Sequence, residues 1–404
     1  MDLEKVKLAL YKYQIKSLIL TIDKDTKHEV HESCIVNFSI VEDYDKYFFP
    51  YFEMTIAVPT ATFRAIKKNA GKIKANLNLY KGKFKQMMST DSLSGASFKK
   101  AITGTFYAYT DDSSPDLTEG EQKMVEKSKD QYGQLSTLKI LLYNQSFYNK
   151  YQLVVNDVLE NVSLAEALTY VLNKAKVTKV LLSPPSNYKL FKQFILTPIP
   201  LSQQIERICN TYAMHKKGTA VFFGLDRLYI IDKTPKCTAY SNNEFKITYI
   251  VADSNSSTIQ NTGGAYSDKD GKFNVLNASQ ISFKNEQEKT KKLLGSNVVS
   301  INNNGKVTKT NKKATKVTRV LVQDEGNSTA KSLKRTMTES KRVLTAQFKD
   351  ADIGMLTPNK QFVVTLTSAQ HKKYNGKYRL TRVIHSFSKE GTYYQLTTSA
   401  EFKG

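Results

Sequence analysis

Short runs of alternating apolar and polar residues, separated by polar turns, recur through the first part of the chain. Four of them lie at 17–22, 33–40, 52–58 and 75–81. A period of two places successive side chains on opposite faces of a strand, so each run predicts a β-strand. Several such strands at near-regular spacing are typical of a β-sandwich or barrel. The pattern therefore restricts this region to a stacked or closed sheet.

A short helix and a polar excursion interrupt these strands. Residues 60–68 read as the helix, with Phe63 and Ile66 on one side. Residues 110–132 are polar, charged and almost without β-branched side chains, which indicates a surface excursion between strands. Because strand character then returns, we expect an N-terminal β-barrel-like domain over residues 1–150.

The residue pattern changes after this domain, and residues 151–235 are predicted to form a small α/β module. Ser163 and Glu166 form a capping-box pattern ahead of apolar residues at helical spacing. A second helix should follow a proline-containing stretch, with Ser202 as its N-cap. Two apolar runs separated by a short turn then predict a hairpin, at 219–223 and 228–232.

The remaining chain divides into three parts. Residues 236–252 are expected to be a strand that returns to the barrel, and residues 253–327 are a polar linker or insertion rich in Asn, Lys and Ser. Residues 328–404 should form a polar helix, at 328–341, followed by an antiparallel β-barrel domain. Within that domain Asn375-Gly376 is a two-residue hairpin signal.

The charge balance is strongly basic. The 404 residues include 60 Lys and Arg against 37 Asp and Glu, a formal net charge of +23. An acidic partner such as nucleic acid, an anionic membrane or another protein must therefore be considered. The excess is almost all lysine, whereas specific phosphate and base recognition relies on the arginine fork. The lysines are spread along a chain that is also rich in Asn, Ile and Tyr, so biased codon usage is the simpler explanation, and single charges on a solvated surface need no partner.

Cysteine usage and hydropathy indicate where the chain folds. The three cysteines, Cys34, Cys209 and Cys237, are far apart and odd in number, which argues against a disulfide framework and fits a reducing compartment. Lysines interrupt the apolar residues near the N-terminus, unlike in a signal peptide. No run approaches the roughly 18 apolar residues of a membrane-spanning helix. We expect a protein that folds in a cytoplasm, with no membrane partner.

Motifs for catalysis, cofactors and metals are not recognisable. The segment 28–32, with His28 and His31, has ligand-type side chains, but its spacing does not match HExxH and a charged turn is the simpler interpretation. No P-loop, GxGxxG or GxSxG occurs. His385 stands between apolar residues in a predicted strand, as a hydrogen-bonded structural histidine does. The sequence therefore predicts no catalytic residues, no cofactor, no metal and no enzyme.

The order of these predicted segments along the chain resembles that of one known family. A barrel-like β-domain precedes a module containing SLAEALTYVL, SPPSNY, QQIERICNTY and AVFFGLDRLYIID, and the chain closes with IGMLTPNKQFVVTL and YNGKYRLTRVIHSFSKEGTYYQLTTSAEF. This resembles the late-control-protein-D-like baseplate hub proteins of phage tails and related injection machines. The closing segment of that family has a Pro turn, a Gly-x-Tyr strand start, an exposed His near a strand end, a Gly turn and a final strand. The corresponding residues here are Pro358, Gly376, Tyr378, His385, Gly391 and Leu396.

The resemblance implies a mainly β fold with α+β parts: two tail-tube-like β-barrel domains, the small α/β module and the polar linker. It further implies a homotrimeric ring that adapts the hexameric tail tube to the trimeric central spike and forms part of the DNA-passage channel. The partners would be two further copies, the tube protein, the spike protein and other baseplate proteins, with DNA present only in transit. The location would be the virion, after assembly in the host cytoplasm. Tyr378, His385 and Tyr394 are candidate barrel or interface positions.

Three other functional classes remain open. One is another structural protein of a virion or secretion machine. A second is a basic nucleic-acid-binding protein, which would cluster its Lys and Arg on one face and bind in a salt-sensitive way. The third, a cell-wall hydrolase fused to a tail protein, would need a carboxylate pair or a metal site, and neither is legible in this sequence.

Overall fold

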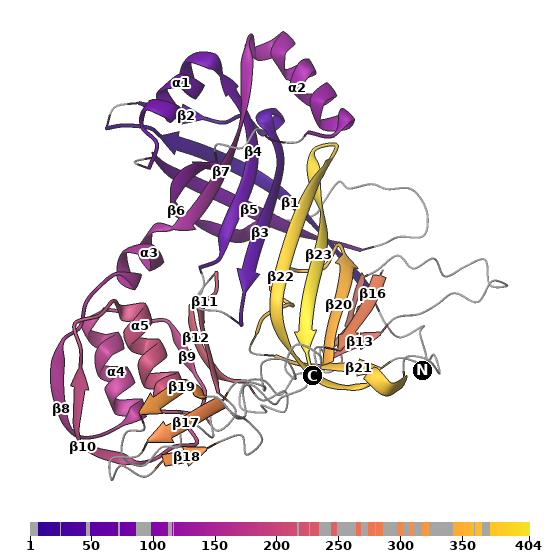
Figure 1. Ribbon diagram of the computed structural model, residues 1–404. Helices are drawn as coiled ribbons and strands as arrows, with labels where there is room; N and C mark the ends of the chain where they lie inside the picture. The colour runs from indigo at the N-terminus through magenta and orange to yellow at the C-terminus, as the bar shows by residue number, and fades with distance from the viewer. Residues whose placement is uncertain are drawn as a thin grey trace.

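The chain is largely β-structure (Figure 1). The computed structural model describes residues 7–24, 26–45, 49–71, 73–85, 98–111, 115, 117–215, 218–225, 227–233, 244–248, 264–267, 274–278, 280–285, 297–301, 307–309, 317–322, 342–358, 360–365 and 372–404. The predicted helix at 328–341 and Cys237 lie outside these residues.

Antiparallel strands of the N-terminal region form the upper domain in Figure 1. They are β1 (Lys7–Thr21), β2 (Lys27–Glu29), β3 (Ile35–Asp43), β4 (Tyr51–Pro59), β5 (Ile73–Lys85), β6 (Phe98–Asp111) and β7 (Leu135–Asn144). The predicted helix at 60–68 is confirmed as α1 (Thr60–Lys68). The polar excursion contains a second helix, α2 (Glu119–Tyr132), which begins with a capping box between Thr118 and Glu121 and buries Val125 against the sheet.

The strands of the second domain come from the later part of the chain. They are β13 (Glu244–Thr248), β14 (Gly264–Ser267), β15 (Asn274–Asn277), β16 (Gln280–Asn285), β20 (Arg342–Lys349), β21 (Gln361–Thr365), β22 (Gly376–Glu390) and β23 (Tyr393–Lys403). A separate small sheet holds β17 (Asn297–Ile301), β18 (Val307–Lys309) and β19 (Val317–Val322). The connection from β21 to β22 includes a 3-10 turn at Lys372–Tyr374, so Asn375-Gly376 does not form the predicted two-residue hairpin.

One continuous sheet closes on itself in the first domain. Its strands follow the order β22-β3-β4-β7-β6-β5-β1-β23, and β22 and β23 pair with each other. The apolar side chains of the alternating strands point inward and form the first core, which includes Leu18, Phe38 and Leu77. The predicted barrel is therefore completed by two strands that lie more than three hundred residues away in the sequence.

The same two strands also belong to the second domain. The early part of β22 pairs with β21, in the register Phe362 with Tyr378, and the later part of β23 pairs with β20, in the register Leu344 with Phe402. Strands β13, β15 and β14 continue from β21, and β14 pairs with the first residues of β1. A second core of buried residues lies inside these strands. The β22–β23 hairpin is thus shared by two barrel-like domains.

The α/β module lies below the first domain and beside the second (Figure 1). Its elements are α3 (Gln145–Tyr151), β8 (Asp157–Ser163), α4 (Leu164–Lys174), β9 (Val180–Leu182), β10 (Leu190–Leu196), α5 (Leu201–Glu206) with a π-helical turn at Arg207–Thr211, β11 (Thr219–Phe223) and β12 (Leu228–Asp232). The predicted capping box of Ser163 and Glu166 and the hairpin are confirmed. Ser202 is not the N-cap of α5, because Pro200 occupies that position and Ser202 is buried inside the helix.

Candidate functional site

The three candidate residues on the shared hairpin lie in different parts of its interior. Tyr378, His385 and Tyr394 are each 0% exposed. Tyr378 belongs to the second core and donates its hydroxyl hydrogen bond to the Tyr374 carbonyl at 2.7 Å. Tyr394 belongs to the first core and makes an edge contact with Phe38, with ring centroids 5.0 Å apart. Burial raises the pKa of the Tyr394 hydroxyl far above its usual value.

His385 lies on the boundary between the two cores. It pairs with Thr398 across the hairpin, and the ring nitrogen Nδ1 and the Thr398 hydroxyl are 2.8 Å apart. On one side of this pair Phe387 belongs to the first core, and on the other side Val383 belongs to the second. Burial lowers the pKa of His385 to about 3, so the ring is neutral near pH 7. The expected exposed histidine is therefore wrong, whereas the expected hydrogen-bonded structural role is confirmed.

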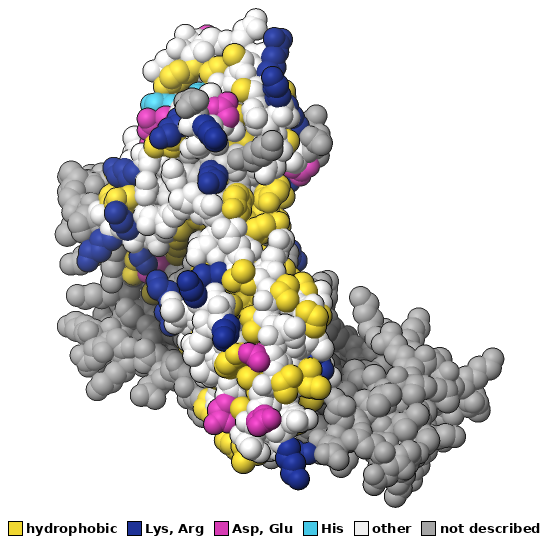
Figure 2. All heavy atoms as spheres, turned by 90° about the vertical axis from the view of Figure 1, so that its left-hand side faces the viewer, with side chains coloured by type: hydrophobic (Ala, Val, Ile, Leu, Met, Phe, Trp, Pro, Cys, Tyr) yellow, Lys and Arg dark blue, Asp and Glu magenta, His cyan; other side chains and the backbone are white. Residues whose placement is uncertain are grey.

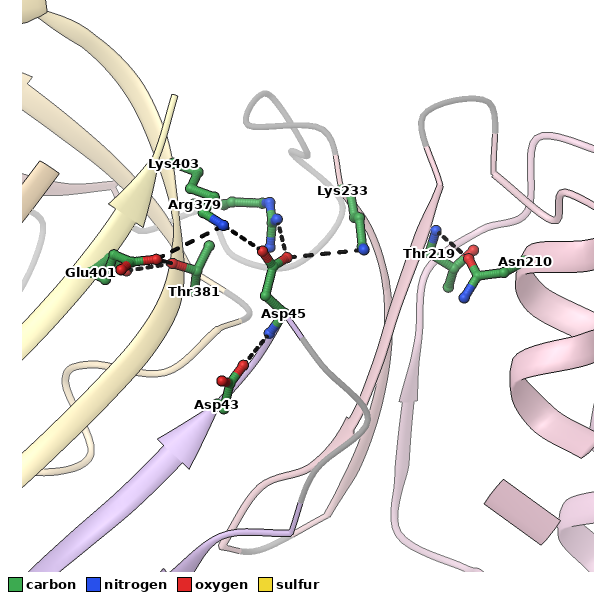
Figure 3. Close-up of polar contacts among 9 residues, drawn as sticks. All are labelled: Asp43, Asp45, Asn210, Thr219, Lys233, Arg379, Thr381, Glu401 and Lys403. Atoms are coloured by element: carbon green, nitrogen blue, oxygen red, sulfur yellow. Dashed lines mark hydrogen bonds and ion pairs between the residues drawn. The ribbon is translucent and has the colours of Figure 1, made fainter. Parts of the chain in front are cut away.

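The carboxylate of Asp45, just beyond the end of β3, forms ion pairs with three cationic side chains where the first domain, the hairpin and the module meet (Figure 3). Arg379 of β22 binds Oδ1, and Lys403 of β23 binds Oδ2 at 2.7 Å. Lys233, which follows β12 of the module, lies 4.0 Å from Oδ1. Burial alone would raise the pKa of Asp45, but Arg379, Lys233 and Lys403 together hold it well below its usual range. The carboxylate stays ionised and links the first domain, the hairpin and the module.

A backbone irregularity at Thr381 lies beside this cluster. The register between β22 and β23 shifts from Leu380 to Arg382, and the Thr381 hydroxyl donates to the Glu401 carbonyl oxygen at 3.0 Å (Figure 3). The Thr381 carbonyl accepts from the Tyr44 amide at 2.7 Å. At this point β22 exchanges its pairing with β21 for pairing with β3. A bulge is a usual way to bend a strand, here from one barrel into the next.

The module joins the second domain through a sheet that is buried on both faces. In β11 and β12, Val221 and Ile230 face the module core, whereas Phe222 and Tyr229 belong to the core of the second domain. Phe222 stacks on Tyr229 with ring centroids 5.3 Å apart. The module is therefore packed into the body of the protein, and the Asp45–Lys233 ion pair lies at the edge of this contact.

Exposed apolar side chains gather on the outer side of the module. Across β8 and β10, Val158 and Ile195 pair directly and are 54% and 56% exposed. The other large exposed hydrophobic residues in the described part of the chain are nearby in the sequence: Leu153, Val154, Tyr188 and Leu190. Figure 2 shows yellow patches over this side of the lower half, with further apolar surface at the waist above it. A surface of this kind is typical of a protein contact.

A half-buried tyrosine cluster lies on the outside of the first domain where it approaches α3. Tyr51 and Tyr143 have ring centroids 5.7 Å apart, and Tyr109 meets Tyr143 at the same distance. Tyr148 of α3 contacts Tyr107 at 5.5 Å. Aromatic clusters of this kind are enriched at protein contacts, so this is a second candidate contact surface.

The two histidines near the start of the chain, His28 and His31, lie in a strand and at a turn. His31 precedes a 3-10 turn, and its Nδ1 accepts from the Ser33 amide at 3.2 Å. His28 lies in β2, paired with Leu20. Within the described residues, no group of three or more His, Cys, Asp or Glu is placed to hold a metal ion. Nor is any helix of that part of the chain long and apolar enough to cross a bilayer.

Comparisons with known proteins show which proteins this chain is similar to. A family model described as Bacteriophage PBS1 gene 109 protein matches residues 3–402. A tail protein from Neisseria meningitidis MC58 is similar in structure, with a TM-score of 0.50 and 9% identity, over 98% of this chain and 96% of that one. This similarity confirms the predicted mainly β fold. No curated protein sequence matches.

Two further solved structures are more distantly similar. The 43 kDa tail protein of prophage MuSo2 from Shewanella oneidensis has a TM-score of 0.45 and 9% identity, over 96% of this chain and 97% of that one. A chain of the lidded Francisella PdpA-VgrG complex has a TM-score of 0.45 and 8% identity, over 98% of this chain and 53% of that one.

Proposed function

The chain belongs to the family of the bacteriophage PBS1 gene 109 protein, and from this premise we propose that it is the structural baseplate hub of a phage tail. In this role three copies form a ring that joins the hexameric tail tube to the trimeric central spike. The ring forms part of the channel through which DNA passes. Assembly takes place in the host cytoplasm, and the protein then stays in the virion without an enzymatic task.

The observation that carries this proposal is the pair of barrel-like domains held in one continuous sheet. A ring of three such chains presents six barrels, which is the number that a hexameric tube offers on its facing surface. The opposite side of the same ring keeps true threefold symmetry, because the α/β module occurs once per chain. A closed ring of this type uses a heterologous contact, in which two different surfaces of the subunit meet.

Rigidity is the second requirement of a hub, since it must pass force between tube and spike. Strands β22 and β23 run through both barrels, so the barrels cannot move apart without loss of backbone hydrogen bonds. The two-sided packing of β11 and β12 holds the module in the same way. In this proposal Tyr378, His385 and Tyr394 act as packing positions inside the subunit, because their side chains are buried within a single chain.

The division of the chain is part of the same proposal. The first barrel corresponds to residues 1–150 closed by β22 and β23, and the module corresponds to residues 151–235. The second barrel combines residues 236–252 with the closing strands of 328–404 and with β14, β15 and β16, which come from within 253–327. The rest of 253–327 is the insertion in this proposal. The exposed apolar side of the module is available for the tube, the spike or another baseplate protein.

Molar mass tests the proposal most directly. Light scattering on a sizing column at high salt suppresses adventitious binding of nucleic acid to the basic chain. A mass three times 45.7 kDa supports the ring. A monomer that also fails to assemble when the tube and spike proteins are added would contradict it.

A further inference from the structure

Lysines are concentrated in three adjacent strands of the first barrel. In the sheet order β6-β5-β1, the strand β1 carries three lysines, β5 four and β6 two. The only acid in these strands is Asp111, the last residue of β6. The facing half of the same barrel is different, because β3, β4 and β7 carry Glu42, Asp43 and Glu53 against the single lysine Lys139. The wall of this barrel is therefore electrostatically polarised.

The lysines of this wall fall into two groups. Lys12 and Lys81 are held by Asp350 and Asp352, at 3.6 Å and 2.7 Å. A second group is exposed, lies on the outer side of these strands and forms no ion pair with any other described residue: Lys16, Lys74 and Lys100. We name this group the free-lysine face. On the other wall Lys139 is neutralised by Glu53 at 2.5 Å and by Asp111 at 3.7 Å.

Between these lysines the outer side of the strands carries neutral hydrogen-bonding side chains in register. Asn78 stands opposite Ser17 and donates to its hydroxyl at 2.8 Å, and Thr105 donates to Asn76 at 2.8 Å. Thr103 stands opposite Asn78 on β6. Among the residues of β1, β5 and β6 whose side chains the structure describes, this outer side is thus cationic and polar, with no exposed carboxylate.

We infer that the free-lysine face contacts the phosphate backbone of double-stranded DNA. The inference rests on the proposed function, since it assigns this wall of the first barrel to the DNA channel of the ring. Lysine, hydroxyl and amide groups are the usual partners of phosphate and sugar oxygens, and such contacts are independent of sequence. The face lacks arginines for bidentate base recognition, which suits a channel through which any sequence must pass.

Salt dependence of binding tests this assignment. A fluorescent duplex of about 30 base pairs is titrated with the full chain at several NaCl concentrations between about 50 and 200 mM. In the variant, Lys16, Lys74 and Lys100 are all changed to Gln. If each lysine neutralises one phosphate, the slope of log K against log salt becomes shallower by about 0.9 per lysine. We expect a slope reduced by about 2 to 3 and binding weakened at least tenfold at the lower salt concentrations.

A matched variant separates the face from the overall charge. Lys68 of α1 and Lys127 and Lys129 of α2 are also exposed and form no ion pair with a described residue, and changing these three to Gln lowers the net charge equally. We expect this control to keep the wild-type slope. Equal losses in both variants would overturn the assignment, because they would indicate diffuse attraction by the whole chain. Competition by polyglutamate at the same phosphate-equivalent concentration as DNA would also overturn it, in favour of an acidic protein surface.

The molar mass of both variants keeps this result separate from the hub proposal. A trimer that shows no difference between the two variants would remove the DNA assignment and leave the hub intact. A monomer that loses DNA binding only in the free-lysine variant would keep the DNA-binding face and remove its place in a ring. Thermal unfolding of both variants checks that the exposed substitutions leave the fold unchanged.

Discussion

Two connections, here called joins, hold the parts of this protein together: one between the two barrels and one between the module and the second barrel. They are built in different ways. The first and second barrels are joined by strands that belong to both, with the His385–Thr398 pair at the boundary of their cores. The module and the second barrel are joined by side-chain packing across β11 and β12, together with the ion pair between Asp45 and Lys233. The first join cannot open without breaking backbone hydrogen bonds, whereas the second can separate along a surface. We therefore expect the barrels to unfold together and the module to loosen separately.

Truncation of one buried phenylalanine at each join should have the largest effect on stability and should expose amides in different regions. Phe387 stacks on Phe38 at 4.1 Å in the shared hairpin, and Phe222 stacks on Tyr229 at the module join. Phe387→Ala and Phe222→Ala should each cost about 3–5 kcal/mol, because each leaves a cavity in a core. Hydrogen exchange should distinguish them: the first change should expose amides of both barrels, and the second mainly amides of the module. Equal exposure of the barrel amides in Phe222→Ala would contradict the comparison.

Neutralising Asp45 should weaken both joins at once. Asp45→Asn leaves the buried guanidinium of Arg379 and the ammonium groups of Lys403 and Lys233 without their shared counter-charge. We expect a loss of about 2–3 kcal/mol, less than for a fully buried pair because Asp45 is partly exposed. Urea unfolding measures this loss without screening the charges.

The pH dependence of this variant provides its control. The folded pKa of Asp45 is depressed, so its contribution is present above the usual carboxyl pKa of about 4 and is lost as the pH falls below that value. The difference in stability between wild type and Asp45→Asn should therefore begin to narrow at about pH 4 and narrow further as the pH falls. A constant difference between them at all pH values would mean that lost packing, and not charge, explains the effect.

Mild acid should act on each region through one buried histidine. Burial lowers the pKa of His385 in the hairpin to about 3 and also lowers that of His215 in the module, where Nδ1 is 2.9 Å from the Thr219 hydroxyl. Each neutral ring stabilises the fold above its usual pKa of about 6.5, and this stability is lost as the pH falls. At pH 5.5 His385 should account for a loss of about 1.4 kcal/mol, and His215 should contribute a loss of the same sign.

Replacement of each histidine separates the two losses. His385→Gln should remove the acid-induced part from the barrels, and His215→Gln should remove it from the module, each measured against the same variant at pH 7. Hydrogen exchange at pH 7 and 5.5 reports the regions separately. The assignment is wrong if His385→Gln keeps the full loss of barrel protection at pH 5.5.

Surface substitutions on the module should have the smallest effect on stability. Val158→Asp combined with Ile195→Asp places charges on the exposed pair of β8 and β10, where the side chains pack little within the chain. We expect unfolding free energies within about 0.5 kcal/mol of wild type. Binding of a hydrophobic dye and association with tail components should fall instead. A large loss of stability would show that this surface is covered within the subunit.

Local signals in the sequence predicted local structure well. The capping box of Ser163 and Glu166, the helix at 60–68 and the strand pairs of the module depend on neighbours in the sequence, and the structure confirms them. Ser202 was misleading because a proline at the N-cap position made its side chain unnecessary there. The helix within the polar excursion was missed because Thr118 and Glu121 are the only strong start signal in a segment with little apolar periodicity.

Contacts between residues far apart in the sequence could not be predicted from local patterns. Asp45 lies in an aromatic-rich segment after β3, and nothing near it in the sequence indicates partners at Arg379 and Lys403. His385 was assigned a structural role correctly from its apolar neighbours, but its position between two cores depends on the pairing of β22 with β3. The polarised wall of the first barrel likewise appears only when β1, β5 and β6 are known to be adjacent.

The shared hairpin also sets the order in which this protein can be made. Tyr13 hydrogen-bonds to the Ala351 carbonyl, and β3 needs β22 as its neighbour, so the first barrel contains partners separated by more than three hundred residues. While a ribosome is still producing the module, β1 and β3 remain open edges. Closing such long loops is slow, and open edges invite pairing with other chains. We therefore expect nascent chains to stay prone to association until β22 and β23 have emerged. A chain truncated before β22 should elute as aggregates on a sizing column, and a monomeric, folded first domain would contradict this.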